Sequence, residues 1–484
     1  MRDPERASPI AWKYLTVSAI LALKLILLLH YGALTSDDTG NYLDVAHAIL
    51  HEPNAFSAVP DWHSAALPRL AFRSYGYPLL IAGGQWLVGD GYGVLLVTCQ
   101  ILLSVVVTAL LFDEALRIAR NGALAAVATL LYGVSIAVLW DGTVMSDSFY
   151  AAAFNLVLLA IIRHYRRGQP FGLAAALALG ALWGWSIWLR DNGVYFTIIP
   201  AAILCLPRFT GGVPRRVAQA GAFLLPVILM VGGYTAWNAY RTGESFFSMT
   251  GVANYLRPAF DIARRGGADP FDDGSPLSRL VKTTMADYHY PEQVLLLQRL
   301  HDVLGLSPLA LQRLTFDKFV DTITRHPVAY GLYVADNLAP AHIGAVLFNP
   351  LASYNDFFQL GLPPHQRIIP GAGLNSFRDL AAKRDAGGLI LAILSLVATV
   401  LATLAWLATL IGFPVLAWRE RRRTGQFSLD TKVAALCYGT ILIVIGLFAL
   451  VHIEARHMLP VIPAGLLAAV YVASRLRRRG YSAA

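Results

Sequence analysis

The sequence predicts an all-α polytopic membrane protein with about ten transmembrane helices. Hydrophobic residues make up 56% of the 484 positions and charged residues only 14%, whereas a soluble domain carries about 25% charged residues. The apolar residues also occur in long runs, and a helix that crosses the bilayer core needs about 20 of them. The predicted spans are 12–34, 92–116, 122–140, 145–162, 171–189, 193–207, 217–237, 387–417, 432–452 and 458–474.

Lys and Arg side chains assign the orientation of these spans. Twenty lie in one alternating set of connections, and the opposite short connections hold only four, which are Arg69, Arg73, Arg190 and Arg456. Because connections rich in Lys and Arg stay in the cytoplasm, we expect a multi-pass protein of the plasma (inner) membrane with both termini cytoplasmic. No small-residue cleavage site follows the first run, so this run is expected to remain as an anchor.

Two regions then lie on the outer side of the membrane. Residues 35–91 begin polar and continue with an amphipathic stretch near Trp86, which is too short to span and is expected to form a helix along the interface. Residues 238–386 form a long extracytoplasmic loop, in which we expect helices at 292–304 and 309–325.

The long loop divides the chain into three predicted parts. They are an amino-terminal transmembrane module with the first outer loop (1–237), the extracytoplasmic loop domain (238–386), and carboxy-terminal transmembrane helices with a basic cytoplasmic tail (387–484). The loop domain is neutral, with 14 basic and 14 acidic residues. The net charge of +9 therefore belongs to the cytoplasmic connections, where anionic lipids attract it, and it does not indicate nucleic-acid binding.

The three cysteines, Cys99, Cys205 and Cys437, all lie in apolar runs. Their spacing matches neither a metal site nor a disulfide framework. They are expected to be small buried hydrophobic residues.

Acidic residues follow two of the outer helix ends. Asp37 and Asp38 come directly after the first span, and Tyr42 lies four residues beyond Asp38. A helix that begins here places Asp38 and Tyr42 on one face. Asp147 lies at the start of the fourth span. Each Asp could serve only as a helix cap or as a favourable charge at a helix N-terminus, or it could carry chemistry.

Basic residues at two further outer helix ends run against the orientation bias. Arg190 ends the fifth span, and Arg456 and His457 follow the ninth. A guanidinium matches phosphate oxygens, so these residues are candidates for binding an anion at the outer leaflet. Alternatively, they snorkel or form local ion pairs, such as Arg190 with Asp191. Arg456 has a similar acidic neighbour in Glu454.

Acids from two outer loops and arginines from two others would meet on one side of the membrane. This mixture suits a reaction with a phosphate leaving group. A carboxylate can take a proton from a hydroxyl acceptor, and cations can stabilise the departing phosphate.

The order of these motifs resembles the GT-C superfamily of membrane glycosyltransferases, specifically the branch of protein O-mannosyltransferases and lipid A aminoarabinose transferases (glycosyltransferase family 39). The resemblance covers most of the chain through short motifs. These are Asp38 with Tyr42, Gly-Tyr-Pro-Leu-Leu at 76–80, Ser146-Asp147, Leu189-Arg190, Trp237–Gly243 and Ala455–Pro460. The chain departs from the family at Thr39, where relatives often have Glu, and at His457, where they have Tyr.

The resemblance implies a polyprenyl-phosphate-linked sugar donor that binds from the outer leaflet, with membrane lipid around it. The sugar would pass with inversion to a glycan, lipid or protein acceptor held against the long loop. Some branches of the superfamily use a divalent cation, which makes one a candidate cofactor without assigned ligands. The implied roles are catalysis for Asp38 or Asp37, positioning of the acceptor or a cation for Asp147 and Tyr42, and donor phosphate binding for Arg190, Arg456 and His457.

Two other functional classes are alternatives. A transporter or lipid flippase would carry polar residues near mid-bilayer and a pseudo-repeat between its halves, yet only Lys24 and His30 lie deep in a span and no repeat is visible. A polysaccharide ligase or polymerase also has a long outer loop, but it would use Arg and His without the first-loop acid.

Overall fold

The computed structural model of the chain describes residues 8–56, 74–169, 171–207, 212–284, 293–351 and 386–480. Over these ranges the chain is helical and forms no β-strand beyond an isolated bridge between Leu34 and Thr143. Seven helical segments of this part of the chain are long and apolar enough to cross a membrane. The protein is therefore a multi-pass membrane protein.

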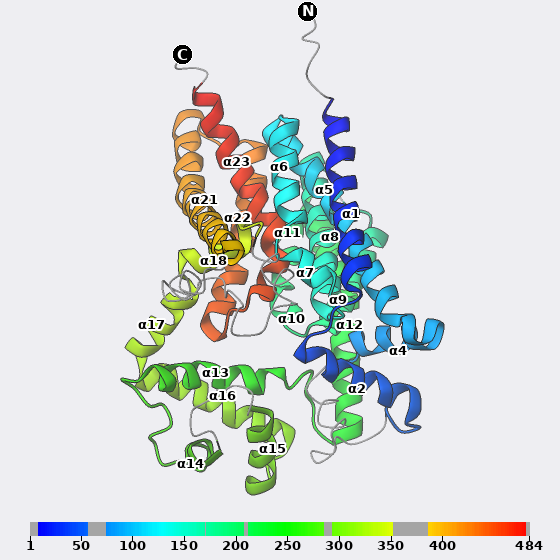
Figure 1. Cartoon of the computed structure of the whole chain (residues 1–484), viewed down its shortest axis with the longest axis vertical. Coiled ribbons are helices and arrows are strands. Elements are labelled where there is room, and N and C mark those ends of the chain that lie inside the picture. The colour runs from blue at the N-terminus through cyan, green and yellow to red at the C-terminus, as the bar shows by residue number, and fades with distance from the viewer. Residues whose placement is uncertain are drawn as a thin grey trace, which may run out of the picture.

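The helices in these seven segments make up most of the upper bundle in Figure 1. Their bounds are α1 (Pro9–Tyr31), α4 (Gly76–Val88) with the 3₁₀ turn η1 (Gly89–Gly91) and α5 (Tyr92–Ala119), α8 (Ser146–Arg167), α12 (Gly212–Thr242), α21 (Ala386–Thr424), α22 (Leu429–Val451), and the 3₁₀ turn η4 (Ala455–Val461) with α23 (Ile462–Gly480).

The remaining three predicted spans are helical but shorter than a bilayer-crossing helix of about 20 residues. They contain α6 (Gly122–Gly133) followed by α7 (Ala137–Asp141), α9 (Leu173–Leu189), and α10 (Gly193–Phe196) with α11 (Ile198–Leu204). All ten predicted segments are thus apolar and helical, and seven of them have the full length of a span.

The centre of the bundle is formed by α8 and α23, which are the most enclosed of the long apolar helices. In its most apolar window α8 is 83% buried and α23 is 78% buried, against 22% for α1 and for α21. Helices pack closely where glycine leaves room. A Cβ atom on Gly180 of α9 would lie 2.1 Å from the backbone oxygen of Phe223 in α12, so this crossing requires glycine on α9.

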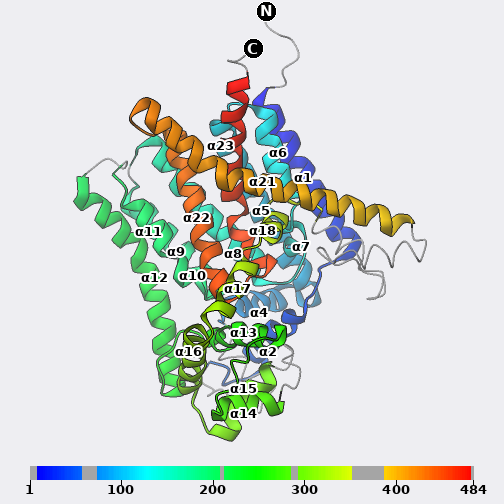
Figure 2. The same ribbon diagram turned by 90° about the vertical axis from the view of Figure 1, so that its left-hand side faces the viewer.

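A second group of helices lies at the end of the bundle away from both termini (Figures 1 and 2). Their bounds are α2 (Asp37–His51), α13 (Thr250–Arg265), α14 (Pro276–Thr284), α15 (Gln293–Leu304), α16 (Pro308–Arg325) and α17 (Pro327–Asn337). The helices predicted at 292–304 and 309–325 are confirmed by α15 and α16. We refer to α13–α17 as the outer helices.

The amphipathic stretch of the first outer loop is the helix α4, which lies at the lower right of the bundle in Figure 1. It buries Tyr77 and Ile81 against the bundle and exposes Trp86 and Leu87. An exposed aromatic and aliphatic edge is what a helix at a lipid interface needs. The structure therefore contains the helix and the exposed apolar face that the prediction of an interfacial helix requires.

One helix of the predicted outer loop returns to the bundle. This helix, α18 (Pro340–Phe348), packs against α21. A Cβ atom on Gly344 would lie 2.7 Å from the Cα of Thr403, and Asn349 Nδ2 donates to Thr399 Oγ1 at 3.1 Å. Because both threonines lie inside the apolar segment of α21, the outer region and the bundle interlock here.

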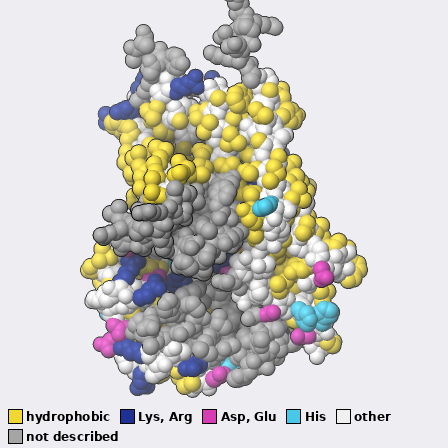
Figure 3. All heavy atoms as spheres, viewed as in Figure 1, with side chains coloured by type: hydrophobic (Ala, Val, Ile, Leu, Met, Phe, Trp, Pro, Cys, Tyr) yellow, Lys and Arg dark blue, Asp and Glu magenta, His cyan; other side chains and the backbone are white. Residues whose placement is uncertain are grey.

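The surface agrees with a membrane location. Figure 3 shows hydrophobic side chains gathered over the bundle, Lys and Arg at the end that carries the termini, and charges of both signs at the opposite end. Both termini lie at the same end of the molecule (Figures 1 and 2). The cytoplasmic assignment of that end stays a prediction based on charge.

Candidate active site

The first acidic motif forms the start of α2. Ser36 and Thr39 make a capping box there, and the Thr39 hydroxyl also donates to the backbone oxygen of Val144 at 3.1 Å. Backbone hydrogen bonds between Leu34 and the 142–144 segment add to this link. As a result, the helix that carries Asp38 is fixed against the loop that precedes Asp147.

Asp38 pairs with an arginine from the far end of the chain. Arg456 Nη1 donates to Asp38 Oδ2 at 2.6 Å across 418 positions, and Asn41 Nδ2 lies 3.4 Å from Asp38 Oδ1. Arg456 Nε also donates to Glu454 Oε2 at 2.5 Å. The predicted local pair between Glu454 and Arg456 is therefore present, and Asp38 joins it. The side chain of Asp37 lies outside what the structure describes.

Asp147 pairs with the second predicted arginine. Arg190 follows the end of α9, and its Nη1 donates to Asp147 Oδ1. Among the described residues Arg190 forms no ion pair with Asp191, the alternative partner, and Asp191 accepts a hydrogen bond from Ser248. Asp147 is 1% exposed, and its Oδ2 finds no hydrogen-bond donor within the described part of the chain. Asp147 Oδ2 is thus a buried carboxylate oxygen that is open to a further hydrogen-bond donor.

The two ion pairs belong to one cluster. The charges of Asp147, Glu454 and Asp38 all act on the Arg456 guanidinium. The charges of Arg190 and Arg456 both act on His457. The structure therefore brings together Asp38, Asp147, Arg190, Arg456 and His457, which the sequence placed on four separate outer connections.

Glu454 organises the segment that carries Arg456. Its Oε1 lies 3.0 Å from His452 Nε2, and its backbone N–H donates to His457 Nδ1 at 3.2 Å. Burial opposes ionisation of Glu454, but the hydrogen bond with His452 and the positive charge of Arg456 outweigh burial and hold its pKa well below the usual range. Glu454 is consequently an anion that holds Arg456 in place through an ion pair. Its structural importance was not evident from the sequence.

His457 has a defined tautomer. Because its Nδ1 accepts the Glu454 N–H, the proton of a neutral ring is on Nε2. The ring stacks on Phe448, with the centroids 4.5 Å apart and the planes 10° apart. This arrangement leaves Nε2–H as a donor on a fixed ring.

Tyr42 lies against the start of α8. Its hydroxyl is 2.9 Å from Ser146 Oγ, next to Asp147 in sequence, and its ring meets Tyr77 edge to face. Tyr42 is only 3% exposed. It therefore fixes the α2–α8 contact, and any role toward an acceptor operates from this buried position.

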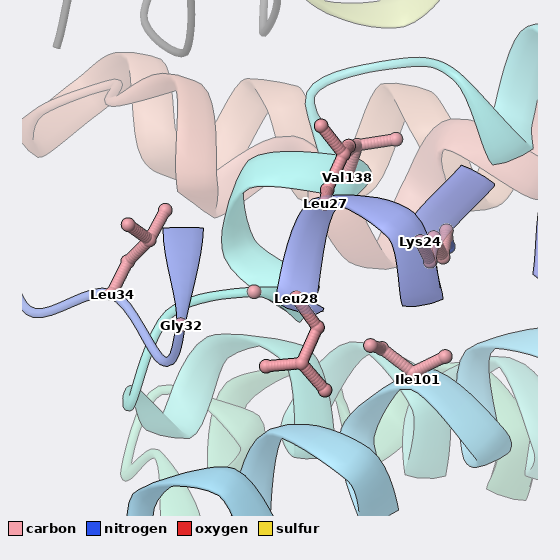
Figure 4. Close-up of a pocket in the computed structure, with 8 residues that line it drawn as sticks. Lys24, Leu27, Leu28, Gly32, Leu34, Ile101 and Val138 are labelled. Atoms are coloured by element: carbon pink, nitrogen blue, oxygen red, sulfur yellow. The ribbon is translucent and has the colours of Figure 1, made fainter. Parts of the chain in front are cut away.

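A further buried ion pair was not expected from the sequence. Lys24 Nζ lies 2.5 Å from Asp141 Oδ2 and donates to Ser104 Oγ at 2.8 Å, and Ser148 donates to the same Asp141. Lys24 is 2% exposed and Asp141 4%. Figure 4 shows Lys24 beside a small cavity, about 10 Å³ in volume, lined by Leu28 and other residues. Such a volume holds one water molecule at most.

The described residues contain no group of three or more His, Cys, Asp or Glu side chains placed to hold a metal ion. Near the two ion pairs, Asp38 and Glu454 are engaged by Arg456 and Asp147 is engaged by Arg190. The donor set there does not form a cation site in this arrangement.

The chain matches no protein-family model and no curated protein sequence. Among solved structures it is similar to the crystal structure of ArnT from Cupriavidus metallidurans bound to undecaprenyl phosphate. That similarity has 15% sequence identity and a TM-score of 0.34, and it covers 96% of this chain and 78% of ArnT.

Proposed function

We propose that this protein is a membrane glycosyltransferase that moves a sugar from a polyprenyl-phosphate donor to an acceptor at the outer face of the inner membrane. The observation that carries the proposal is the cluster in which Asp38 contacts Arg456 and Asp147 contacts Arg190. Carboxylates and guanidinium groups are the two components that the reaction needs. The acceptor class, whether lipid, glycan or protein, stays open.

The proposed chemistry assigns one role to each kind of group. Asp38 accepts the proton of the acceptor hydroxyl, the acceptor oxygen forms a bond to the anomeric carbon, and the bond from that carbon to the phosphate oxygen breaks. The electron pair of the broken bond stays on the phosphate, where Arg190 and Arg456 stabilise it. The Nε2–H of His457 adds a neutral donor.

The ion pairs give this mechanism an order of events. Asp38 Oδ2 is occupied by the Arg456 guanidinium, so a donor phosphate that binds Arg456 competes with Asp38 for the same N–H groups. Arrival of the phosphate therefore releases the carboxylate that must accept the proton. A base that is released only after the donor binds reduces unproductive proton transfer in the empty site.

We assign binding of the acceptor to Asp147. Its Oδ1 is held by Arg190, and its Oδ2 has no donor among the described residues. A hydroxyl or amine of the acceptor would satisfy that buried oxygen. Tyr42, through Ser146, holds the start of α8 in position for this contact.

The test is sugar transfer by the purified protein from a series of labelled polyprenyl-phosphate sugars. We expect wild type to turn over at least one donor. Asp38→Asn should bind that donor at least as tightly as wild type, because the competing carboxylate is gone, but should lose at least about 100-fold in turnover. Asp90→Asn is the matched control, because Asp90 is an exposed carboxylate in η1 outside the cluster. Undiminished turnover by Asp38→Asn would remove Asp38 as the base, and wild type that turns over no donor would remove the proposal.

The Lys24–Asp141 pair is the one observation that favours a second function, a transporter or lipid flippase, because charged residues within a membrane often mark a translocation path. The cavity beside Lys24 is only about 10 Å³ and has no room for a solute. We therefore place this function second. Uptake or flipping of a polyprenyl-phosphate sugar in liposomes, without sugar transfer, would reverse that order.

A further inference from the structure

The outer end of α22 leads directly into the candidate active site. The chain becomes extended at His452, so the backbone oxygens of Ala449, Leu450 and Val451 receive no hydrogen bond from a further helical turn. Carbonyl groups at a helix end take donors from side chains or from water instead. The residues that supply these donors come from a distant part of the chain.

The donors are three side chains of α17. Asn337 Nδ2 donates to the Ala449 oxygen at 2.9 Å, and Tyr330 OH donates to the Leu450 oxygen at 2.7 Å. Tyr333 OH donates to the Val451 oxygen. Spacings of three and four residues put these three donors on one face of α17. We call Tyr330, Tyr333 and Asn337 the α17 anchor.

The α17 anchor belongs to the outer helices. Tyr330 and Tyr333 form a buried cluster with Ile262 of α13 and with side chains of α16. Arg265 of α13 forms an ion pair with Asp336 of α17. A movement of α13 or α16 would therefore move α17, and Figure 2 shows α17 between these helices and the lower end of α22.

On the other side, the anchored carbonyls lie close in sequence to the site. Val451 is followed by His452, whose ring contacts Glu454 at 3.0 Å. Glu454 in turn holds Arg456 at 2.5 Å, and Arg456 contacts Asp38 at 2.6 Å. A continuous series of contacts thus runs from the outer helices to the Asp38–Arg456 pair.

We propose that the α17 anchor positions Arg456, so that the conformation of the outer helices sets how well the site binds a phosphate. Tyr330, Tyr333 and Asn337 are positioning residues that act through the end of α22 and do not touch the reacting groups. The role of Arg456 as a phosphate ligand rests on the proposed function. The mechanical link between α17 and residues 452–457 does not.

The test uses the Tyr330→Phe/Tyr333→Phe protein, which loses two hydroxyl donors and keeps both rings in the buried cluster. Hydrogen exchange of the backbone amides of residues 452–457 is measured in the full-length protein in detergent. We expect exchange to become at least about 10-fold faster there, because the segment opens locally without global unfolding. Binding of sugar-free polyprenyl phosphate should weaken by about 10-fold.

Two further variants make the test specific. Asn337→Leu removes the third donor and leaves both tyrosines unchanged. It should accelerate hydrogen exchange of the same backbone amides. Tyr240→Phe removes a hydroxyl from a tyrosine of α12 that is 83% exposed, and it should change neither exchange nor binding.

The outcomes separate this proposal from the proposed function. Unchanged exchange at 452–457 in both anchor variants would overturn the proposal, and so would faster exchange with unchanged polyprenyl phosphate binding. Faster exchange and weaker binding, in a protein that turns over no donor sugar, would support the α17 anchor and remove the glycosyltransferase proposal alone.

Discussion

Arg456 receives two carboxylates, Asp38 from the distant helix α2 and Glu454 from its own segment, just before η4. The three groups carry one positive and two negative charges, and Asp147 adds a further negative charge nearby. A monoanionic phosphate would therefore meet repulsion unless a carboxylate moved away or took up a proton. Arg190 offsets the charge of Asp147, so under the proposed function it supplies the second positive charge that a phosphate at Arg456 would need.

The Lys24–Asp141 pair predicts a large effect of a single substitution. Lys24→Met leaves the Asp141 carboxylate buried without its cation and should lower the free energy of unfolding by about 3–5 kcal/mol. Lys24→Met/Asp141→Asn removes both charges and should recover most of that loss. Thermal unfolding in detergent checks both values.

The control for this prediction is Lys13→Met. Lys13 pairs with Asp113, but their side chains are 30% and 23% exposed, and an exposed pair contributes about 0–1 kcal/mol. A double variant as unstable as Lys24→Met alone would show that the pair does not account for the loss.

Glu454 predicts how stability depends on pH. Its pKa is lowered in the folded protein, so ionised Glu454 stabilises the fold at every pH above the ordinary value of 4.5, and this contribution is lost as pH falls from 4.5 toward the folded value. We expect Glu454→Gln to melt at a lower temperature than wild type at neutral pH. This difference in melting temperature should shrink at pH values below 4.5, the ordinary pKa of a glutamate. A difference that widens on acidification would contradict this assignment.

The grouping of the site residues could be predicted from the sequence, and their pairing could not. Asp38, Asp147, Arg190 and Arg456 each flank a span, so the alternation of charge puts all four on one side. Which arginine meets which acid depends on the packing of the spans. Arg190 contacts Asp147 and not the adjacent Asp191. Nothing in the sequence around Arg190 indicates this pairing.

At the scale of elements, the α9–α12 crossing predicts sensitivity to a single methyl group. In Gly180→Ala the new Cβ would lie 2.1 Å from the Phe223 oxygen. The two helices must separate, and overpacking of this kind costs about 1–3 kcal/mol. Gly221→Ala is the matched control on α12, because a Cβ there meets nothing within 4 Å. Equal melting temperatures for the two variants would contradict the crossing.

The helices differ in how well the sequence reveals them. Long apolar runs predicted α1, α5, α12, α21 and α22, because a bilayer demands an apolar side chain at nearly every position of a lipid-facing helix. The return of α18 to the bundle was missed. Its apolar residues at 343–348 form a run too short to be a span, inside a loop of mixed charge. Only its contact with α21 shows where it belongs.

For the whole molecule, the charge pattern and the position of the termini predict sidedness. Cys99, Cys205 and Cys437 are replaced by Ala, and one new cysteine is introduced at Thr283 of α14 or at Gln426 after α21. An impermeant maleimide added outside intact cells should label Thr283→Cys and leave Gln426→Cys unlabelled. The reverse result would invert the topology and place the cluster on the cytoplasmic side.

The pairing of Asp38 with Arg456 also determines when the site can exist during biosynthesis. The two residues are 418 positions apart, so all the helices between them must leave the ribosome before the guanidinium can reach its carboxylate. The Asp38–Arg456 pair therefore cannot form until residue 456 has been synthesised. A premature stop codon just upstream of position 456 would yield a product with most of its membrane helices and without the pair.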